Sequence, residues 1–171
     1  MPTLGIGTWQ NTDPEECANA VATALDMGYR HVDTAQAYDN EDSVGEGLAR
    51  ADAPREDVFL ATKVWIDQLG GDDVRTSTEE SLSKLGVDYL DLLYIHWPAG
   101  AYDPADTLAA FDDLYDEGLI ERIGVSNFEP GQVTEAVETA DTPIFANQIQ
   151  CHPLLPQGEL RAHCADHDVE V

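Results

Sequence analysis

Two kinds of hydrophobic pattern alternate along the chain. Short runs of consecutive apolar residues, rich in Val, Ile and Leu, are separated by longer segments in which apolar residues recur every three or four positions. The first pattern is typical of strands that are buried on both faces of a sheet, and the second of amphipathic helices. The apolar runs predict five strands and the start of a sixth, over residues 30–35, 58–64, 90–96, 120–126, 144–150 and 169–171.

Helices are predicted between these strands, each with one apolar face. They cover, in chain order, residues 43–51, 72–85, 104–117, 130–139 and 157–168. A further helix precedes the first strand and follows a glycine-rich loop; its apolar face consists of Ala20, Val21, Ala24 and Leu25. Regular alternation of strands and helices, with continuous apolar strands, predicts a parallel sheet that is buried on both faces.

Two parallel architectures are common, and the turns between strands and helices distinguish them. A Rossmann domain would carry Gly-x-Gly-x-x-Gly at such a turn, and no such motif occurs here. The alternative is the (β/α)8 TIM barrel. We therefore expect one α/β domain over residues 1–171, an incomplete TIM barrel with about six of the eight strands present.

Each predicted strand ends on a residue that could take part in chemistry. These residues are Asp33, Lys63, His96, Ser126 with Asn127, and Gln148. Singly, each has an ordinary explanation as a helix cap, a surface amine or a residue at the rim of the core. The strand ends of a parallel barrel all meet at one mouth, where such enzymes place their active sites. The series therefore predicts a functional site at that mouth.

Several longer motifs resemble those of the aldo-keto reductase family, and they follow in the family's order. They are "LGIGTWQ", "GYRHVDTAQAYDNE", "TKVW", "LDLLYIHWP", "IGVSNF" and "NQIQCHPLLPQ". The resemblance runs the length of the chain and is closest to small aldehyde and 2,5-diketo-gluconate-type reductases. It implies an oxidoreductase that reduces aldehydes or ketones to alcohols with NAD(P)H.

The resemblance implies four catalytic residues: Asp33, Tyr38, Lys63 and His96. Carbonyl reduction needs a hydride on carbon, which the cofactor supplies, and a proton on oxygen. A phenol is a weak acid at neutral pH. The ammonium of Lys63, oriented by Asp33, would stabilise the phenolate of Tyr38 and so make this tyrosine a better proton donor. The imidazole of His96 would donate a hydrogen bond to the carbonyl oxygen of the substrate and fix the orientation of that carbonyl.

The resemblance also implies contacts with cofactor and substrate. The carboxamide of the nicotinamide would be held by Ser126, Asn127 and Gln148. Asp33 would lie near the nicotinamide ribose. A small carbonyl substrate would lie in an apolar pocket walled by Trp9, Trp65, His96 and Trp97. For the tryptophans, plain core packing is the alternative. Family habit favours NADP(H) as the cofactor, with NAD(H) as the alternative.

The sequence departs from the family's pattern at both ends. The opening "MPTLGIGTW" resembles the middle of the family's N-terminal β-hairpin, so we expect that hairpin to be partial. The chain stops at the sixth predicted strand, before the strands whose loops would hold the pyrophosphate and the adenosine 2′-phosphate. An unclosed barrel leaves two sheet edges unpaired. We therefore expect a truncated gene product that turns over weakly or not at all by itself.

Two other functions remain open. The same fold can serve as a nucleotide-binding regulatory or sensor subunit, and the chain could equally be an inactive fragment of an enzyme. The complete set of four catalytic-type residues favours the enzyme, because a pure binding module needs neither Tyr38 nor Lys63.

The net charge of −26 arises from 34 acidic and eight basic residues. Nucleic acids and anionic membranes are recognised by clustered Lys and Arg, so neither is an expected partner. The acidic residues are spread evenly, which favours adaptation to high salt over an acidic protein of an ordinary cytoplasm. Only two lysines occur, and we expect Lys84 on the surface and Lys63 away from it.

Three irregularly spaced cysteines predict no disulfide framework and favour the cytoplasm. There is no signal peptide and no apolar run near 20 residues, so no membrane span is expected. We expect a monomer if the protein is complete. The C-terminal segment contains five candidate metal ligands without zinc-finger spacing, and no metal site is expected from Cys151, His152, His163, Cys164 and His167.

Overall fold

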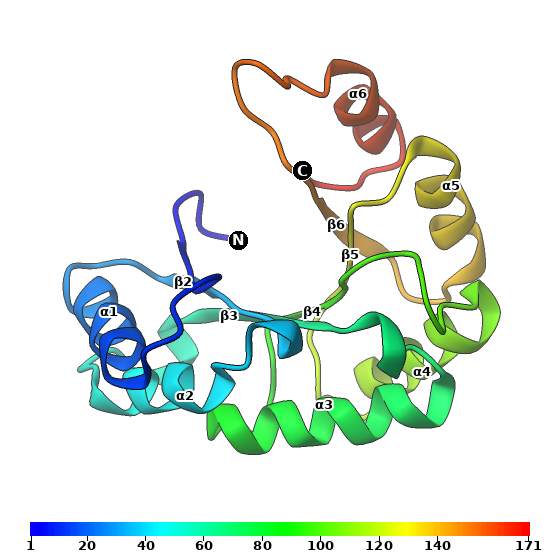
Figure 1. The fold of residues 1–171 in the computed structure, drawn as a ribbon. Coiled ribbons are helices and arrows are strands. Elements are labelled where there is room, and N and C mark those ends of the chain that lie inside the picture. The colour runs from blue at the N-terminus through cyan, green and yellow to red at the C-terminus, as the bar shows by residue number, and fades with distance from the viewer.

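Six strands lie side by side in the order in which they occur in the chain, and every pairing between neighbours is parallel. The computed structural model describes all of residues 1–171. Its strands are β1 (Ile6–Gly7), β2 (His31–Asp33), β3 (Phe59–Val64), β4 (Leu92–Ile95), β5 (Ile123–Ser126) and β6 (Ile144–Gln148). The sheet is strongly curved and open, and the two ends of the chain lie beside its opening (Figure 1).

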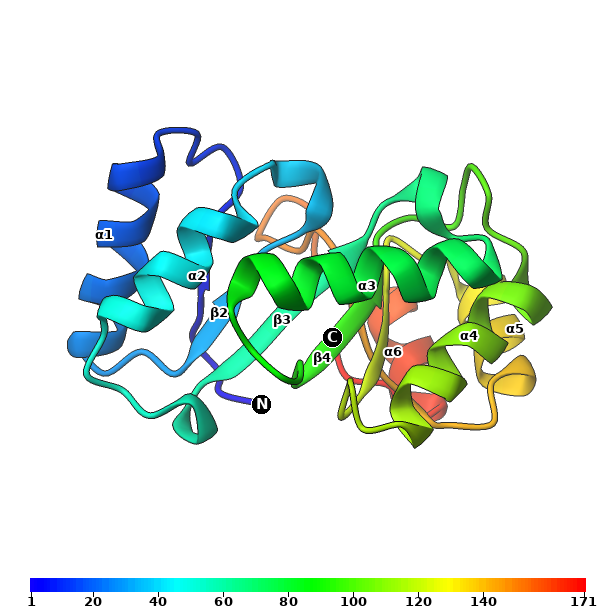
Figure 2. The same ribbon diagram turned by 90° about the horizontal axis from the view of Figure 1, so that it is seen from below.

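Helices follow the strands and cover the convex side of the sheet, as Figures 1 and 2 show from two directions. The α-helices are α1 (Pro14–Asp26), α2 (Glu41–Arg50), α3 (Gly71–Leu85), α4 (Pro104–Asp116), α5 (Pro130–Thr139) and α6 (Gly158–Asp166). Three short 3₁₀ helices lie in the loops: η1 (Gln36–Tyr38), η2 (Arg55–Asp57) and η3 (Ile66–Gln68). The arrangement confirms the α/β class and the incomplete barrel. None of these helices has both the length and the apolar composition needed to cross a membrane.

Proline and a preceding acidic residue define where several helices begin. Asp13 accepts a hydrogen bond from the backbone nitrogen of Glu16, and Asp103 accepts one from that of Asp106. In both cases proline occupies the next position, where its missing N–H costs nothing and its fixed φ angle suits the helix. The loops therefore end at defined residues.

The two ends of the sheet contain one strand that the sequence did not predict and one predicted strand that is only begun. Ile6 and Gly7 pair in parallel with Val32 and Asp33, so this segment is an edge strand of the sheet rather than half of an antiparallel hairpin. One apolar residue between two glycines is too short a run to reveal a strand. At the other end, residues 169–171 form only a single bridge, between Glu170 and Ala146. Glu170 thus lies parallel to β6, where the predicted last strand would start, and β1 is an additional strand that the sequence did not predict.

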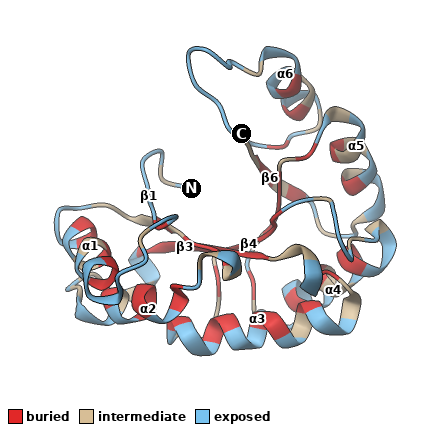
Figure 3. Cartoon of the chain, viewed as in Figure 1, coloured by how far each residue is buried: buried red, intermediate tan, exposed pale blue.

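Buried residues are concentrated on the strands and on the helix faces that touch them (Figure 3). The main core lies between sheet and helices and takes its side chains from alternate strand positions, such as Leu60 and Val64 of β3. The intervening positions point to the concave side, where Phe59, Ala61, Leu92, Tyr94 and Ala146 form a second, smaller cluster.

This alternation determines which strand-end residues can meet. Side chains two positions apart on a strand point to the same side of the sheet. Lys63 is two positions after Ala61, His96 two after Tyr94, and Gln148 two after Ala146. All three therefore face the concave side, above the second cluster. Gly124 leaves space there for Tyr94, because a Cβ atom at this position would lie 2.5 Å from the tyrosine ring. The carboxyl ends of the strands thus surround one polar region.

Candidate active site

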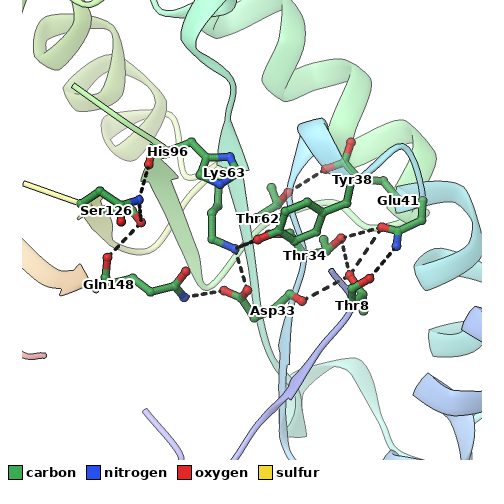
Figure 4. Close-up of polar contacts among 12 residues, drawn as sticks. Thr8, Asp33, Thr34, Tyr38, Glu41, Thr62, Lys63, His96, Ser126 and Gln148 are labelled. Carbon is green, nitrogen blue, oxygen red and sulfur yellow. Dashed lines mark hydrogen bonds and ion pairs between the residues drawn. The ribbon is translucent and has the colours of Figure 1, made fainter. Parts of the chain in front are cut away.

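Figure 4 shows the polar side chains that the carboxyl ends of β2 to β6 bring together. Asp33 ends β2, Lys63 is the penultimate residue of β3, and His96 directly follows β4. Ser126 ends β5 and Gln148 ends β6. Hydrogen bonds connect every member of this set except the His96 ring. The strand-end residues predicted from the sequence therefore lie at one place.

Lys63 is the centre of the site. Its side chain is fully buried, and its ammonium donates hydrogen bonds to three oxygens. The distances from Nζ are 2.6 Å to Oδ1 of Asp33, 2.8 Å to the carbonyl oxygen of Thr34 and 3.3 Å to the hydroxyl of Tyr38. Three acceptors match the three hydrogens of an ammonium, so the buried charge is both paired and fully hydrogen-bonded. Lys84, in contrast, is exposed, as expected.

Tyr38 reaches the site from the short helix η1 rather than from a strand. The side chain of Gln36 holds η1 in place, because its amide donates to the carbonyl oxygen of Ser77 and accepts from the backbone nitrogen of Trp65. Asp39 then adopts a left-handed conformation with φ of 54°, which turns the chain into α2. The tyrosine remains partly exposed, with its ring centroid 5.0 Å from Nζ of Lys63.

His96 is held between two aromatic rings. Its ring centroid lies 5.7 Å from that of Tyr38 and 5.0 Å from that of Trp65, both in edge-to-face geometry. Burial, together with the nearby charge of Lys63, lowers the pKa of His96 to about 4. The imidazole is therefore neutral near pH 7. Nδ1 is buried without a hydrogen-bond partner, which leaves Nε2 as the nitrogen available to a bound molecule.

The lowered pKa of His96 predicts an acid-dependent loss of stability. In the unfolded chain the imidazole has its ordinary pKa of about 6.5, so the unfolded state binds the proton first as the pH falls. The folded state therefore loses stability from about pH 6.5 downwards, by about 2 kcal/mol at about pH 5. Urea unfolding at neutral pH and at about pH 5 checks this. His96→Gln should lose about 2 kcal/mol less than the wild-type chain over that interval. An equal loss in both proteins would contradict the prediction.

The three residues predicted to hold a carboxamide form a chain of hydrogen bonds. Ser126 Oγ donates to the carbonyl oxygen of Gln148 at 2.9 Å, and Asn127 Nδ2 donates to Ser126 Oγ at 3.0 Å and to the carbonyl oxygen of His96 at 3.1 Å. Asn127 has φ of 63°, a left-handed conformation that asparagine tolerates better than most residues. The three residues therefore belong to the same site as His96.

Gln148 also contacts Asp33, which sequence analysis did not predict. Its Nε2 donates to Oδ2 of Asp33 at 2.8 Å, while Oδ1 of the same carboxylate accepts from Lys63. The two residues are 115 positions apart in the sequence, and only the closure of the curved sheet brings them together. Both oxygens of Asp33 are thus occupied, which fixes the carboxylate between β3 and β6.

The three tryptophans differ in their relation to the site. Trp65 is partly buried and packs its ring against His96. Trp9 is 69% exposed and Trp97 is 46% exposed, and neither makes a ring contact with the other aromatic side chains. Core packing, the alternative considered from the sequence, therefore does not account for Trp9 or Trp97.

A second buried polar network supports the site and was missed from the sequence. The hydroxyl of Thr8 donates to that of Thr34 at 2.9 Å, and Thr34 donates in turn to Oδ1 of Asn40 at 3.1 Å. Asn40 Nδ2 donates back to the carbonyl oxygen of Thr8 at 2.9 Å. The network joins the end of β1 to Thr34, whose carbonyl oxygen accepts from Lys63. Two of its members lie in "GYRHVDTAQAYDNE", where only the aspartate and the tyrosine stood out.

The five candidate metal ligands do not form one cluster. Cys164 is fully buried in the main core, and Cys151 and His152 are exposed in the loop before α6. His163 and His167 lie near each other on and just after α6. No group of three or more His, Cys, Asp or Glu side chains is arranged to share a metal ion.

Known proteins with a similar sequence or structure share one family description. Residues 3–171 match the model of the Aldo/keto reductase family. The chain is 49% identical to an aldo-keto reductase of Mycolicibacterium smegmatis, over 94% of the chain and 58% of that relative. It is 43% identical to a 9,11-endoperoxide prostaglandin H2 reductase of Trypanosoma cruzi, over 100% of the chain and 60% of that relative.

A solved structure extends the similarity to the fold. An aldo-keto reductase from Bombyx mori, solved in complex with NADP, matches with a TM-score of 0.95 and 36% sequence identity. The match covers 99% of the chain and 61% of that structure. The chain thus spans about 60% of the length of the relatives it matches.

Proposed function

Because the chain belongs to the aldo-keto reductase family, we propose that its site reduces small aldehydes or ketones to alcohols with NAD(P)H. One observation carries the proposal. The fully buried side chain of Lys63 contacts both the carboxylate of Asp33 and the hydroxyl of Tyr38. Burying an ammonium costs free energy, and directing it at a partly exposed phenol suits proton donation by that phenol.

Tyr38 is the proton donor in this proposal. When the phenol gives up its proton, negative charge develops on an oxygen that lies 3.3 Å from Nζ of Lys63. The attraction between the two charges is stronger in buried surroundings than in water. Asp33 holds the ammonium in place through the 2.6 Å hydrogen bond. The three residues thus have separate tasks: donor, activator and positioning group.

His96 orients the carbonyl and does not act as the acid. Because its pKa is lowered to about 4, the ring is already uncharged at pH 7 and has no acidic imidazolium proton to donate. A neutral imidazole can still donate one hydrogen bond from Nε2 to the substrate oxygen. This supports Tyr38, rather than His96, as the source of the proton.

The nicotinamide cofactor, when bound, supplies the hydride. The residues present suit its carboxamide. The side-chain oxygens of Asn127 and Gln148 accept no hydrogen bond from the protein, and neither is a buried atom closed off from a ligand. They can accept from the carboxamide nitrogen, and the hydroxyl of Ser126 lies beside them. The NADP complex of the Bombyx mori relative supports NADP(H), with NAD(H) as the alternative.

We extend the proposal to the protein's setting. The three cysteines form no disulfide, which supports a reducing cytoplasm. The net charge of −26 supports function at high salt, where repulsion between surface carboxylates is screened. We also propose that the complete protein is a monomer acting on a small-molecule substrate, with no nucleic acid or membrane as a partner.

An assay of NADPH binding and oxidation tests this function. Because the chain spans about 60% of its relatives' length, two proteins are compared in molar salt: the chain itself and the chain joined to the remaining part of the Mycolicibacterium smegmatis relative. We expect both binding and aldehyde-dependent oxidation of NADPH in the joined protein, and slower oxidation by the chain alone. NADPH binding without oxidation in either would favour a sensor, and the absence of binding in a folded protein would favour an inactive fragment.

A further inference from the structure

Two histidines at the end of α6 direct their ring nitrogens at one hydroxyl oxygen of α5. His163 lies in the last turn of α6, and His167 follows four residues later at the helix end. Their Nε2 atoms lie 2.9 Å and 3.4 Å from the same hydroxyl oxygen, that of Thr134 on α5. The ring centroids are 4.4 Å apart, and both side chains are partly exposed.

The hydrogen bonds around His167 determine which of its nitrogens carries a lone pair. Nδ1 lies 2.9 Å from the carbonyl oxygen of His163, which can only accept, so Nδ1 carries the hydrogen. In the neutral ring Nε2 therefore carries the lone pair, and it faces the hydroxyl of Thr134. The threonine has a single hydroxyl hydrogen and a second acceptor nearby, the carbonyl oxygen of Pro130 at 3.2 Å. One hydrogen cannot serve both acceptors well.

We propose that His163, His167 and Thr134 bind a divalent transition-metal ion of the Zn²⁺, Ni²⁺ or Cu²⁺ class. Imidazole nitrogens are ligands that these ions prefer, and here two of them lie four residues apart at the end of a helix. The ion lies between the two Nε2 atoms, with the Thr134 hydroxyl and water completing its coordination. Hard ions such as Mg²⁺ and Ca²⁺ prefer oxygen ligands, so they do not suit the site.

The surroundings of the two histidines favour the same conclusion. A metal-binding histidine typically donates its other ring N–H to a carbonyl or carboxylate, and His167 donates to the carbonyl oxygen of His163. The net charge of −26 raises the local concentration of cations near the surface. The ligands come from two helices and are 29 positions apart at the Thr134–His163 contact, so cysteine and histidine spacing alone does not reveal the site.

A bound ion would fasten α6 to α5. Only Leu160 and Cys164 of α6 are buried, so this helix has few other anchors on the rest of the molecule. The simpler alternative is a hydrogen-bond relay in which His163 donates to Thr134 and Thr134 donates to His167. The relay needs no ion, and the two accounts differ in what added metal does.

The test is calorimetric titration of the chain, free of any histidine tag, with Zn²⁺ and Ni²⁺ at neutral pH. We expect one ion per chain and a saturable rise in Tm. His163→Ala and His167→Ala should each weaken binding by about tenfold or more. His152→Ala is the matched control, because this exposed histidine lies outside the cluster and its loss should leave the affinity unchanged.

A second measurement needs no variant. Paramagnetic Ni²⁺ should broaden the ring-proton NMR signals of His163 and His167 at concentrations that leave those of His152 sharp. The proposal is overturned if affinity is the same in the wild-type chain and in both α6 variants, or if all three histidines broaden together. Either result would mean adventitious surface binding only. Because this site is separate from the strand ends, its failure would leave the proposed reductase function untouched.

Discussion

Tyr38→Phe should abolish carbonyl reduction while leaving NADPH binding nearly unchanged. The substitution removes only the hydroxyl that lies 3.3 Å from Nζ of Lys63, and the ring that packs against His96 stays. Loss of a positioned acid lowers a rate by about 100-fold to 10,000-fold. The measurement is the single-turnover rate of NADPH oxidation by a small aldehyde, together with the Kd for NADPH, in the joined protein.

A second tyrosine provides the control for this prediction. Tyr115 is 41% exposed on α4 and donates no hydrogen bond, so Tyr115→Phe should leave both the rate and the Kd unchanged. If Tyr38→Phe also turned over at the wild-type rate, the hydroxyl of Tyr38 could not be the proton donor.

Asp33→Ala should lower the free energy of unfolding by about 3 kcal/mol and should also slow reduction. Lys63 is fully buried, and Asp33, whose side chain is 17% exposed, is its ion-pair partner. Without the carboxylate, the ammonium keeps only two neutral acceptors, the carbonyl oxygen of Thr34 and the hydroxyl of Tyr38. An uncompensated buried charge is strongly destabilising. Urea unfolding at neutral pH measures the loss.

Two further variants make this prediction specific. The double variant Asp33→Ala/Lys63→Met should recover much of the lost stability, because it removes the unpaired charge as well, but it should remain inactive. Asp67→Ala, at an exposed position without hydrogen bonds, should stay within about 0.5 kcal/mol of the wild-type chain. Equal stability of Asp33→Ala and Asp67→Ala would show that the ion pair does not support the fold.

The position of the site could be predicted from the sequence because strand periodicity is a local property. Apolar runs locate the strands, and the parity within each run assigns Lys63, His96 and Gln148 to one face. A parallel sheet then requires their carboxyl ends to lie together. The five strands predicted before residue 151 all overlap observed strands, although the observed strands are shorter. In two of them the first predicted residue, Leu90 or Ile120, lies outside the observed strand, and these two residues pair only with each other in an isolated bridge.

Contacts that depend on the curvature of the sheet could not be predicted. The hydrogen bond from Gln148 to Asp33 joins the second strand to the last, across the concave side. No local pattern encodes that distance. Likewise, β1 is visible only because the backbone of Ile6 and Gly7 finds a partner in β2. Asn40 and its threonine partners appear as ordinary loop residues until tertiary structure buries them.

The central claim is that the buried Lys63 serves proton donation by Tyr38 in a hydride-transfer reaction. The most direct test is transfer of deuterium from NADPH that carries deuterium at both C4 positions of the nicotinamide ring to a small aldehyde, followed by mass spectrometry of the alcohol formed. The joined protein should place the label on the former carbonyl carbon in a single turnover, and its Tyr38→Phe variant should not do so on the same timescale. NADPH binding without label transfer, or equal transfer by the Tyr38→Phe variant, would contradict the claim.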